Sequence, residues 1–221
     1  MIDVSSILPA EPVRIIIGAG RQRWQGWIPT NRKNLDLLKP EEWEQSFRDR
    51  PVDAILCENV WQQLTEMEGR RAAELCYKYL KPGGYLRCAV PDGYFQNKSS
   101  RFGMLGSQKK SSYPSKKFKM AYNYRLLSDV FIQAGFEVDL LEYCDEKGRF
   151  HYHQWNTEDG PIYRSLMLDW RNQRGMIENA SLIIDAKKSA DQKECTLNNR
   201  PVDFFKIKRP HFETLVRRSR G

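Results

Sequence analysis

Short runs of aliphatic and β-branched residues alternate along this chain with segments of helical periodicity, and no other feature constrains the fold as much. We interpret the apolar runs as strands at 13–17, 26–29, 52–57, 85–90, 136–141 and 181–186. Helical spacing predicts a helix beginning at Pro40, with Trp43 and Phe47 facing inward, and further helices over 66–80 and 122–134. Strands that alternate with helices predict an α/β domain with a mainly parallel sheet and helices on both faces.

Charge and periodicity predict the domain limits. We expect a single domain over 13–188, with an extension at 1–12 and a basic tail at 189–221. The net charge of +8 is uneven, because the stretch 96–119 holds seven Lys and Arg without a single acid. That stretch has no periodicity, so we expect a long loop that closes over the ligand cleft as a lid. Its scarcity of aromatic residues argues against nucleic acid as a partner.

Composition indicates the compartment in which the protein works. The sequence contains no stretch of about 18 consecutive apolar residues, so we expect no membrane span. The first residues lack the pattern of a secretory signal. The five cysteines are odd in number and form no C-x-x-C pair. Free cysteines inside apolar runs favour a reducing compartment, so we expect a cytoplasmic protein without a disulfide framework or a metal site.

Three polar or glycine-containing loops directly follow three of the expected strands. They are Gly18-Ala19-Gly20, Glu58-Asn59 and Pro91-Asp92-Gly93. Ligands of open α/β sheets bind beyond the carboxyl ends of the strands, and glycines there let the backbone approach a ligand closely. A G-x-G pattern alone is equally typical of a tight turn. The third glycine of a dinucleotide fingerprint is missing, because Arg23 occupies its place.

The stretch Leu-Lys-Pro-Gly-Gly-Tyr-Leu-Arg-Cys-Ala-Val-Pro-Asp at 80–92 resembles the segment around the fifth strand of class I S-adenosylmethionine-dependent methyltransferases. Gly18-Ala19-Gly20 resembles their first glycine motif, and 52–65 resembles their fourth-strand segment. The resemblance implies a Rossmann-like fold of that type, with S-adenosylmethionine as cofactor. It is nearest to a bacterial subfamily without an assigned substrate, which shares the stretches 26–31, 134–148, 155–165, 169–172 and 181–188.

The same resemblance implies a set of site residues. It places the cofactor against Gly18, Gly20, Asn31, Asp36, Glu58 and Asn59, and it leaves Glu58 and Asp92 as candidate catalytic carboxylates. The cofactor ribose is usually bound by an acid after the second strand, for which Asn31 is the nearest candidate here. For Glu58 and Asp92 the alternative is a structural role as a cap of the following helix or turn.

Several positions depart from the subfamily pattern. Two histidines and an acid of its fourth-strand motif are replaced by Asn59, Gln62 and Gln63, and a further histidine is replaced by Phe118. No group that titrates near neutral pH remains at these positions. Methyl transfer needs a general base only when the acceptor is protonated, so we expect an ionised acceptor to react better than a neutral sugar.

We therefore expect a methyltransferase-like protein that acts on a small-molecule or glycan acceptor, with a phosphorylated sugar as the anionic candidate. The alternative is a catalytically impaired relative that serves as a cofactor- or partner-binding scaffold. His151 and His153 are expected on a surface strand, whereas the alternative is a metal site completed by Glu158 or Asp159. We expect three aromatic residues to pack beneath the last strands, and the alternative is that they stack on a ligand: Trp155, Tyr163 and Trp170.

Overall fold

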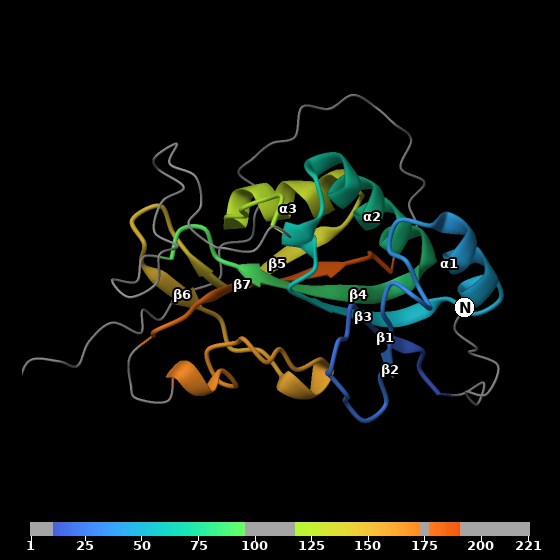
Figure 1. Ribbon diagram of the computed structural model, residues 1–221, viewed down its shortest axis with the longest axis horizontal. Coiled ribbons are helices and arrows are strands. Elements are labelled where there is room, and N and C mark those ends of the chain that lie inside the picture. Colours follow the sequence, from blue (N-terminus) through green and yellow to red (C-terminus); the bar gives the residue numbers. More distant parts are fainter. Residues whose placement is uncertain (1–10, 96–117, 173–176, 191–221) are drawn as a thin grey trace, which may run out of the picture.

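The computed structural model describes residues 11–95, 118–172 and 177–190, which form one seven-stranded sheet in the order β2-β1-β3-β4-β7-β5-β6 (Figure 1). The strands are β1 Arg14–Ile17, β2 Ile28–Pro29, β3 Val52–Glu58, β4 Leu80–Pro91, β5 Glu137–Cys144, β6 Phe150–Tyr152 and β7 Ser181–Lys187. Strands β1 to β4 pair in parallel, and β7 runs antiparallel between β4 and β5. The expectation of a mainly parallel sheet is confirmed.

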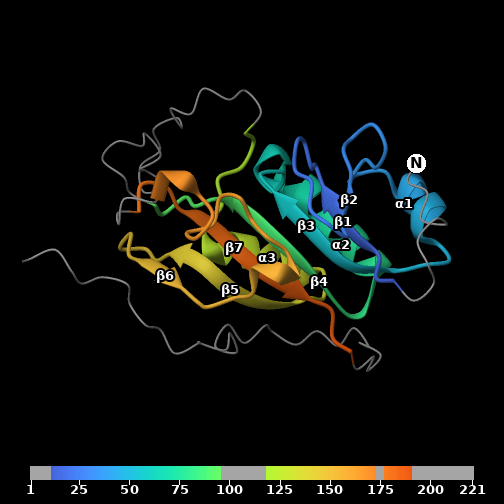
Figure 2. The same ribbon diagram turned by 90° about the horizontal axis from the view of Figure 1, so that it is seen from below.

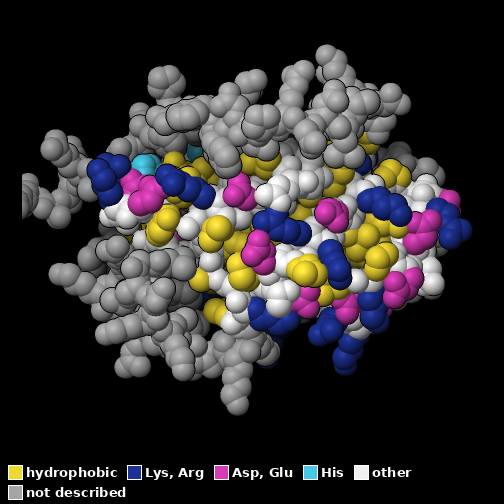
Figure 3. Space-filling view, turned by 90° about the horizontal axis from the view of Figure 1, so that it is seen from above, with side chains coloured by type: hydrophobic (Ala, Val, Ile, Leu, Met, Phe, Trp, Pro, Cys, Tyr) yellow, Lys and Arg dark blue, Asp and Glu magenta, His cyan; other side chains and the backbone are white. Residues whose placement is uncertain are grey.

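Three α-helices cover one face of the sheet (Figure 1). They are α1 Pro40–Phe47, α2 Glu66–Tyr79 and α3 Tyr124–Gln133. Each begins where its sequence favours a start: Pro40 opens α1, Thr65 and Glu68 form a capping box on α2, and Asn123 caps α3. The outer surface of this layer carries cations and acids interspersed, as expected of a solvated face (Figure 3).

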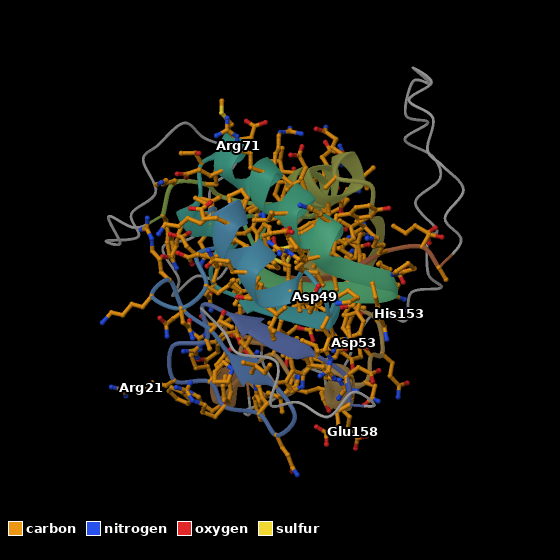
Figure 4. The ribbon with its side chains drawn as sticks, turned by 90° about the vertical axis from the view of Figure 1, so that its right-hand side faces the viewer. Arg21, Asp49, Asp53, Arg71, His153 and Glu158 are labelled. Atoms are coloured by element: carbon orange, nitrogen blue, oxygen red, sulfur yellow. The ribbon has the colours of Figure 1, made fainter. Side chains whose placement is uncertain are left out.

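The opposite face is covered by short 3-10 helices and connecting segments. The 3-10 helices η2 Thr157–Asp159 and η3 Trp170–Asn172 belong to one stretch, residues 153–172, which we call the strap. In Figure 2, where the molecule is seen from below, the strap crosses in front of the sheet. Figure 4 places Arg71 of α2 on one side of the sheet and Arg21 and Glu158 on the other. The helical cover therefore differs between the faces, with α-helices on one and 3-10 turns on the other.

Side chains alternate between two apolar clusters because successive residues of a strand point to opposite faces. The cluster beneath the α-helices includes Ile55, Leu86 and Ile184, together with the inward-facing Trp43 and Phe47 predicted from helical spacing. The cluster beneath the strap includes Ile16, Leu56, Ile183, Trp27 and Trp155.

Strand β4 begins earlier than predicted. The sequence placed its start at Tyr85, after a Pro-Gly-Gly stretch expected to end the preceding helix, whereas the strand begins at Leu80 directly after α2. Backbone pairing holds the glycines in the sheet, since Gly83 donates to the Lys188 carbonyl and Lys188 donates to the Gly84 carbonyl. The other boundaries shift by a few residues, as is common at element ends.

Three sequence-based expectations fall mainly outside the described residues. The lid at 96–119 is described only from Phe118, the extension at 1–12 only from Glu11, and the tail only to Ala190. These remain predictions. Among the described cysteines, Cys57, Cys76, Cys88 and Cys144 are free and buried, as expected. None of the helices in the described part of the chain is long and apolar enough to span a membrane.

Candidate functional site

The residues that follow β1, β2, β3 and β4 lie along one edge of the sheet, because these strands are parallel. Gly18 follows β1, Asn31 lies just beyond β2, Glu58 ends β3, and Asp92 follows β4. The topology therefore brings the ends of these four strands, and the residues that follow them, to one edge of the sheet. Asp36 lies further along the connection toward α1.

The loop from Gly18 to Trp27 joins β1 to the parallel strand β2 without a helix. Parallel strands are usually joined by longer connections that contain a helix. Gly18 and Gly20 both have a positive φ, 62° and 53°. A Cβ on Gly18 would lie 2.5 Å from Cγ2 of Val60, whereas a Cβ on Gly20 would meet no atom within 4 Å. Gly18 is therefore needed for packing, and Gly20 presents open backbone at the edge.

The carboxylate of Glu58 is buried and fully engaged. Oε2 accepts a hydrogen bond from Nε2 of Gln22 at 2.5 Å and one from the backbone of Tyr163 at 3.0 Å. Oε1 accepts from the backbone of Arg164 at 2.9 Å. Burial raises the pKa of Glu58, while these three donors oppose the rise. Glu58 thus fastens both the β1–β2 loop and the strap to the end of β3.

The amides that replace the expected histidines form a local network. Asn59 adopts a left-handed backbone, with φ of 60°, and donates its N–H to the carbonyl of Ala89. Its own carbonyl accepts from Nε2 of Gln63 at 2.6 Å, and its Oδ1 accepts from Nε2 of Gln62 at 3.3 Å. These residues shape the turn after β3 and offer no group for proton transfer.

Asn31 and Asp36 differ in how they are held. The Asn31 side chain accepts from the Lys33 backbone at 3.0 Å and is otherwise exposed. Asp36 is buried, accepting from Arg32 at 3.0 Å and from the Leu38 backbone at 3.0 Å. Its N–H donates to Glu42 in the first turn of α1. Asp36 therefore organises the approach to α1, while Asn31 keeps a side chain available at the sheet edge.

Asp92 is buried at the end of β4. Its Oδ2 accepts from the backbone of Cys144 at 2.6 Å, and its Oδ1 accepts from the backbone of Tyr94 at 2.8 Å. Burial raises the pKa of Asp92 to about 6, against the lowering effect of these donors. The carboxyl ties the end of β4 to the end of β5.

Sequence reasoning missed the buried charges that hold the strap. Arg87 of β4 forms a bidentate pair with Asp185 of β7, with distances of 2.7 Å and 2.9 Å. Its remaining NH1 donates to the carbonyls of Asn156 and Gly160 at 3.1 Å and 2.7 Å. Arg87 and Asp185 are register partners on antiparallel strands, so only knowledge of the register could have revealed the pair.

A third anchor of the strap is Glu142 of β5, which is fully buried. Its Oε1 accepts from Nε1 of Trp155 at 3.1 Å, and its Oε2 accepts from the backbone of Leu166 at 2.8 Å. Burial raises the pKa of Glu142 to about 7. Glu58, Arg87 and Glu142 together hold the strap at points between Trp155 and Leu166.

The aromatic residues of the strap follow the prediction only in part. Trp155 is buried as expected, but Tyr163 is 42% exposed and Trp170 is 71% exposed. Instead of packing beneath strands, the Tyr163 ring packs at a tilt of 33° against Trp24, with centroids 4.7 Å apart. The cause is that Glu58 holds the backbone of Tyr163 at the rim of the sheet, which leaves its side chain directed outward.

His151 lies on the edge strand β6, as predicted. Its ring lies 3.1 Å from Oδ2 of Asp145 and stacks on Tyr143. His153 is exposed beyond the strand end. Within the described ranges, no three His, Cys, Asp or Glu side chains converge to hold a metal ion.

No family model and no curated protein matches this chain. Solved structures do match. A SAM-dependent methyltransferase from Archaeoglobus fulgidus is 16% identical, with 80% of this chain and 87% of that chain covered and a TM-score of 0.44. One from Mesorhizobium loti is 12% identical, with 81% and 93% covered and a TM-score of 0.46.

A third match is a possible histamine N-methyltransferase from Thermotoga maritima, at 17% identity, with 84% of this chain and 86% of that chain covered and a TM-score of 0.43. At such identities, and with TM-scores below 0.5, these matches carry no argument about what this chain does. The sheet order and the antiparallel β7 describe a Rossmann-like, mainly parallel α/β fold.

Proposed function

We propose that this chain binds S-adenosylmethionine at the carboxyl edge of β1, β2 and β3 and transfers its methyl group to a glycan or a phosphorylated sugar. The observation that carries the proposal is the open backbone at Gly20, which has a left-handed conformation and no atom within 4 Å of an added Cβ. Such a position lets a ligand approach the main chain closely. Four buried free thiols support a reducing compartment such as the bacterial cytoplasm.

The site residues divide into two groups in this proposal. Gly20, Asn31 and Asn59 lie at the edge and are our candidates for contact with the cofactor. Gly18, Asp36 and Glu58 act behind them, since each is packed or hydrogen-bonded into the loops that form the edge. When bound, the cofactor supplies an activated methyl group, so the chain itself has to bind, orient and exclude water.

The carboxylates at this edge of the sheet are poorly placed to act as a general base. Both oxygens of Glu58 and both oxygens of Asp92 already accept backbone N–H groups. These donors favour the ionised carboxylate, so they oppose the uptake of a proton from an acceptor hydroxyl. We therefore infer an acceptor whose reacting atom is already deprotonated, and slow or absent methylation of neutral sugars.

The same engagement of both carboxylates favours a second candidate function, a scaffold that binds cofactor or a partner without turnover. The two functions share the cofactor site and differ in product formation. S-Adenosylhomocysteine released from S-adenosylmethionine in the presence of phosphorylated sugars supports the enzyme. Binding of cofactor without release across neutral and phosphorylated sugars supports the scaffold.

The test of the cofactor site is calorimetric titration of S-adenosylhomocysteine into the full chain and two glycine variants. Gly20→Leu places a side chain where the ligand approaches, so we expect the dissociation constant to rise by at least about tenfold. Gly26→Leu is the matched control, because Gly26 also has a positive φ and open space but lies near the start of β2. No binding by the natural sequence at millimolar ligand, or equal losses in both variants, would refute the proposal.

A further inference from the structure

The strap carries Tyr163 and Arg164, which are neighbours in the sequence, directly beside the candidate cofactor edge. The backbone N–H groups of Tyr163 and Arg164 both donate to Glu58, at 3.0 Å and 2.9 Å. Glu58 is the last residue of β3. The backbone of both residues is therefore held at the carboxyl end of that strand.

The ring of Tyr163 is available to a ligand in part. Tyr163 is 42% exposed, and its ring packs at a tilt against Trp24, whose loop is fastened to the same carboxylate through Gln22. The indole Nε1 of Trp24 is shielded from solvent and has no hydrogen-bond partner among the described residues. A shielded N–H without an acceptor is unfavourable, and a ligand hydroxyl that reached it would satisfy it.

The guanidinium of Arg164 is only weakly neutralised. Its side chain is 41% exposed, and its ion pair with Asp169 is long, at 3.5 Å. Asp169 already receives a closer pair from Arg171. On the neighbouring loop, Arg23 donates to the carbonyls of Gly20 and Gln22 and forms no ion pair with a described residue.

The acids nearest these cations are already engaged, Asp169 by Arg171 and Glu58 by backbone N–H groups. Figure 4 shows Glu158 and Arg21 of the β1–β2 loop apart from each other, on the side of the sheet away from Arg71. The rim around Tyr163 and Arg164 thus combines an aromatic surface with a local excess of positive charge. Phosphate binds guanidinium groups strongly, and the apolar face of a sugar ring packs well on an aromatic ring.

We propose that Tyr163 and Arg164 form the acceptor subsite, and that the acceptor is a phosphorylated sugar whose ring packs on Tyr163 while its phosphate binds Arg164. The role of the bound sugar as methyl acceptor rests on the proposed function, but the binding of the sugar itself needs no cofactor. The assignment also agrees with the inference that an anionic acceptor is favoured, because neither Glu58 nor Asp92 is free to act as a base.

The experiment is a titration of the ¹⁵N-labelled full chain without cofactor, followed through the indole N–H signal of Trp24. Glucose 6-phosphate should shift this signal saturably. Glucose and inorganic phosphate should each bind at least about tenfold more weakly, because each makes only one of the two contacts. Trehalose 6-phosphate tests whether the phosphorylated ring can belong to a longer glycan, and binding as tight as that of glucose 6-phosphate would assign the site to glycans.

Substitutions separate the two contacts. Arg164→Gln should reduce the affinity for glucose 6-phosphate to that for glucose, and Tyr163→Ala should reduce it to that for inorganic phosphate, whereas Tyr163→Phe should retain it. Arg125→Gln, on the outer face of α3, is the matched control and should change nothing. Equal affinity for inorganic phosphate and glucose 6-phosphate, or equal effects of the two arginine variants, would overturn the proposal. Because S-adenosylhomocysteine binding is measured separately, a failure here leaves the proposed cofactor site standing.

Discussion

The two faces of the sheet are stabilised by different means, although the same strands supply both. Beneath the α-helices, β3, β4 and β7 present Ile55, Leu86 and Ile184 to a continuous apolar cluster. Beneath the strap, the residues next to these on β4 and β7 are Arg87 and Asp185, and both are buried. One face is thus closed by apolar side-chain packing, and the other by an apolar cluster together with charged groups that bind backbone.

The difference follows from what covers each face. An α-helix satisfies its own backbone and needs only an apolar stripe to pack. The strap has little regular structure, so its carbonyls and N–H groups need partners from the sheet. Arg87 binds two carbonyls, while Glu58 and Glu142 bind three backbone N–H groups between them. The candidate site lies on the face whose cover depends on these contacts.

The largest expected effect comes from removing the central anchor. Arg87→Met leaves Asp185 buried without its partner and releases the carbonyls of Asn156 and Gly160. We expect a loss of about 3 to 5 kcal/mol in the free energy of unfolding, the usual result of breaking a buried pair. Urea denaturation measures it.

The double variant Arg87→Met with Asp185→Leu sharpens this comparison. The double variant removes the unpaired charge of Asp185, but it does not restore the hydrogen bonds from Arg87 to the strap carbonyls. The free energy of unfolding should therefore recover only in part. The remaining deficit reports what Arg87 contributes to holding the strap. Full recovery would mean that the strap does not depend on Arg87, and the contrast between the faces would fail.

The helix face was largely predictable from the sequence, and the strap face was not. Apolar residues at helical and strand spacing revealed Trp43, Phe47 and the strands, because burial of apolar side chains leaves a periodic pattern. A buried Arg87 or Glu142 looks in sequence like any solvent-facing residue of a half-buried strand. Its burial depends on a segment without periodicity, which only the three-dimensional arrangement brings into place.

The candidate site shows the same division. Gly18, Glu58 and Asp92 could be placed at one edge because parallel strands end together. The partners of Glu58 could not be predicted, since the backbones of Tyr163 and Arg164 come from more than 100 residues away along the chain. Spacing within a sequence predicts position at a strand end, but it does not predict long-range hydrogen bonds.

A pH dependence provides the next largest effect. The pKa of Glu142 is raised from 4.5 to about 7, and that of Asp92 from 3.8 to about 6. Both folded-state values lie above the unfolded ones, so their contribution to stability is fully present below about pH 4 and is lost as the pH rises toward 7. Glu142→Gln should flatten the decline in unfolding free energy between pH 5 and pH 8 by about 1 to 3 kcal/mol.

The readout for this variant is the slope with pH, because glutamine has a single acceptor for the two donors at Glu142 and lowers stability at every pH. The indole signal of Trp155, whose N–H binds Glu142, should titrate near neutral pH in the natural sequence only. An unchanged slope in Glu142→Gln would show that this carboxyl is ionised throughout the range.

The smallest expected effect tests whether burial, rather than charge pairing, distinguishes the strap face. Asp139 and Lys187 form an ion pair at 2.7 Å between β5 and β7, two residues along β7 from Asp185, and both side chains are 51% exposed. Exposed pairs contribute little because water and salt screen them, so Asp139→Asn should change the unfolding free energy by less than about 1 kcal/mol. That change should shrink further in high salt, whereas the Arg87→Met loss should persist. A loss as large as that of Arg87→Met would show that an exposed ion pair on β7 stabilises the sheet as much as the buried pair does, and burial would then not distinguish the strap face.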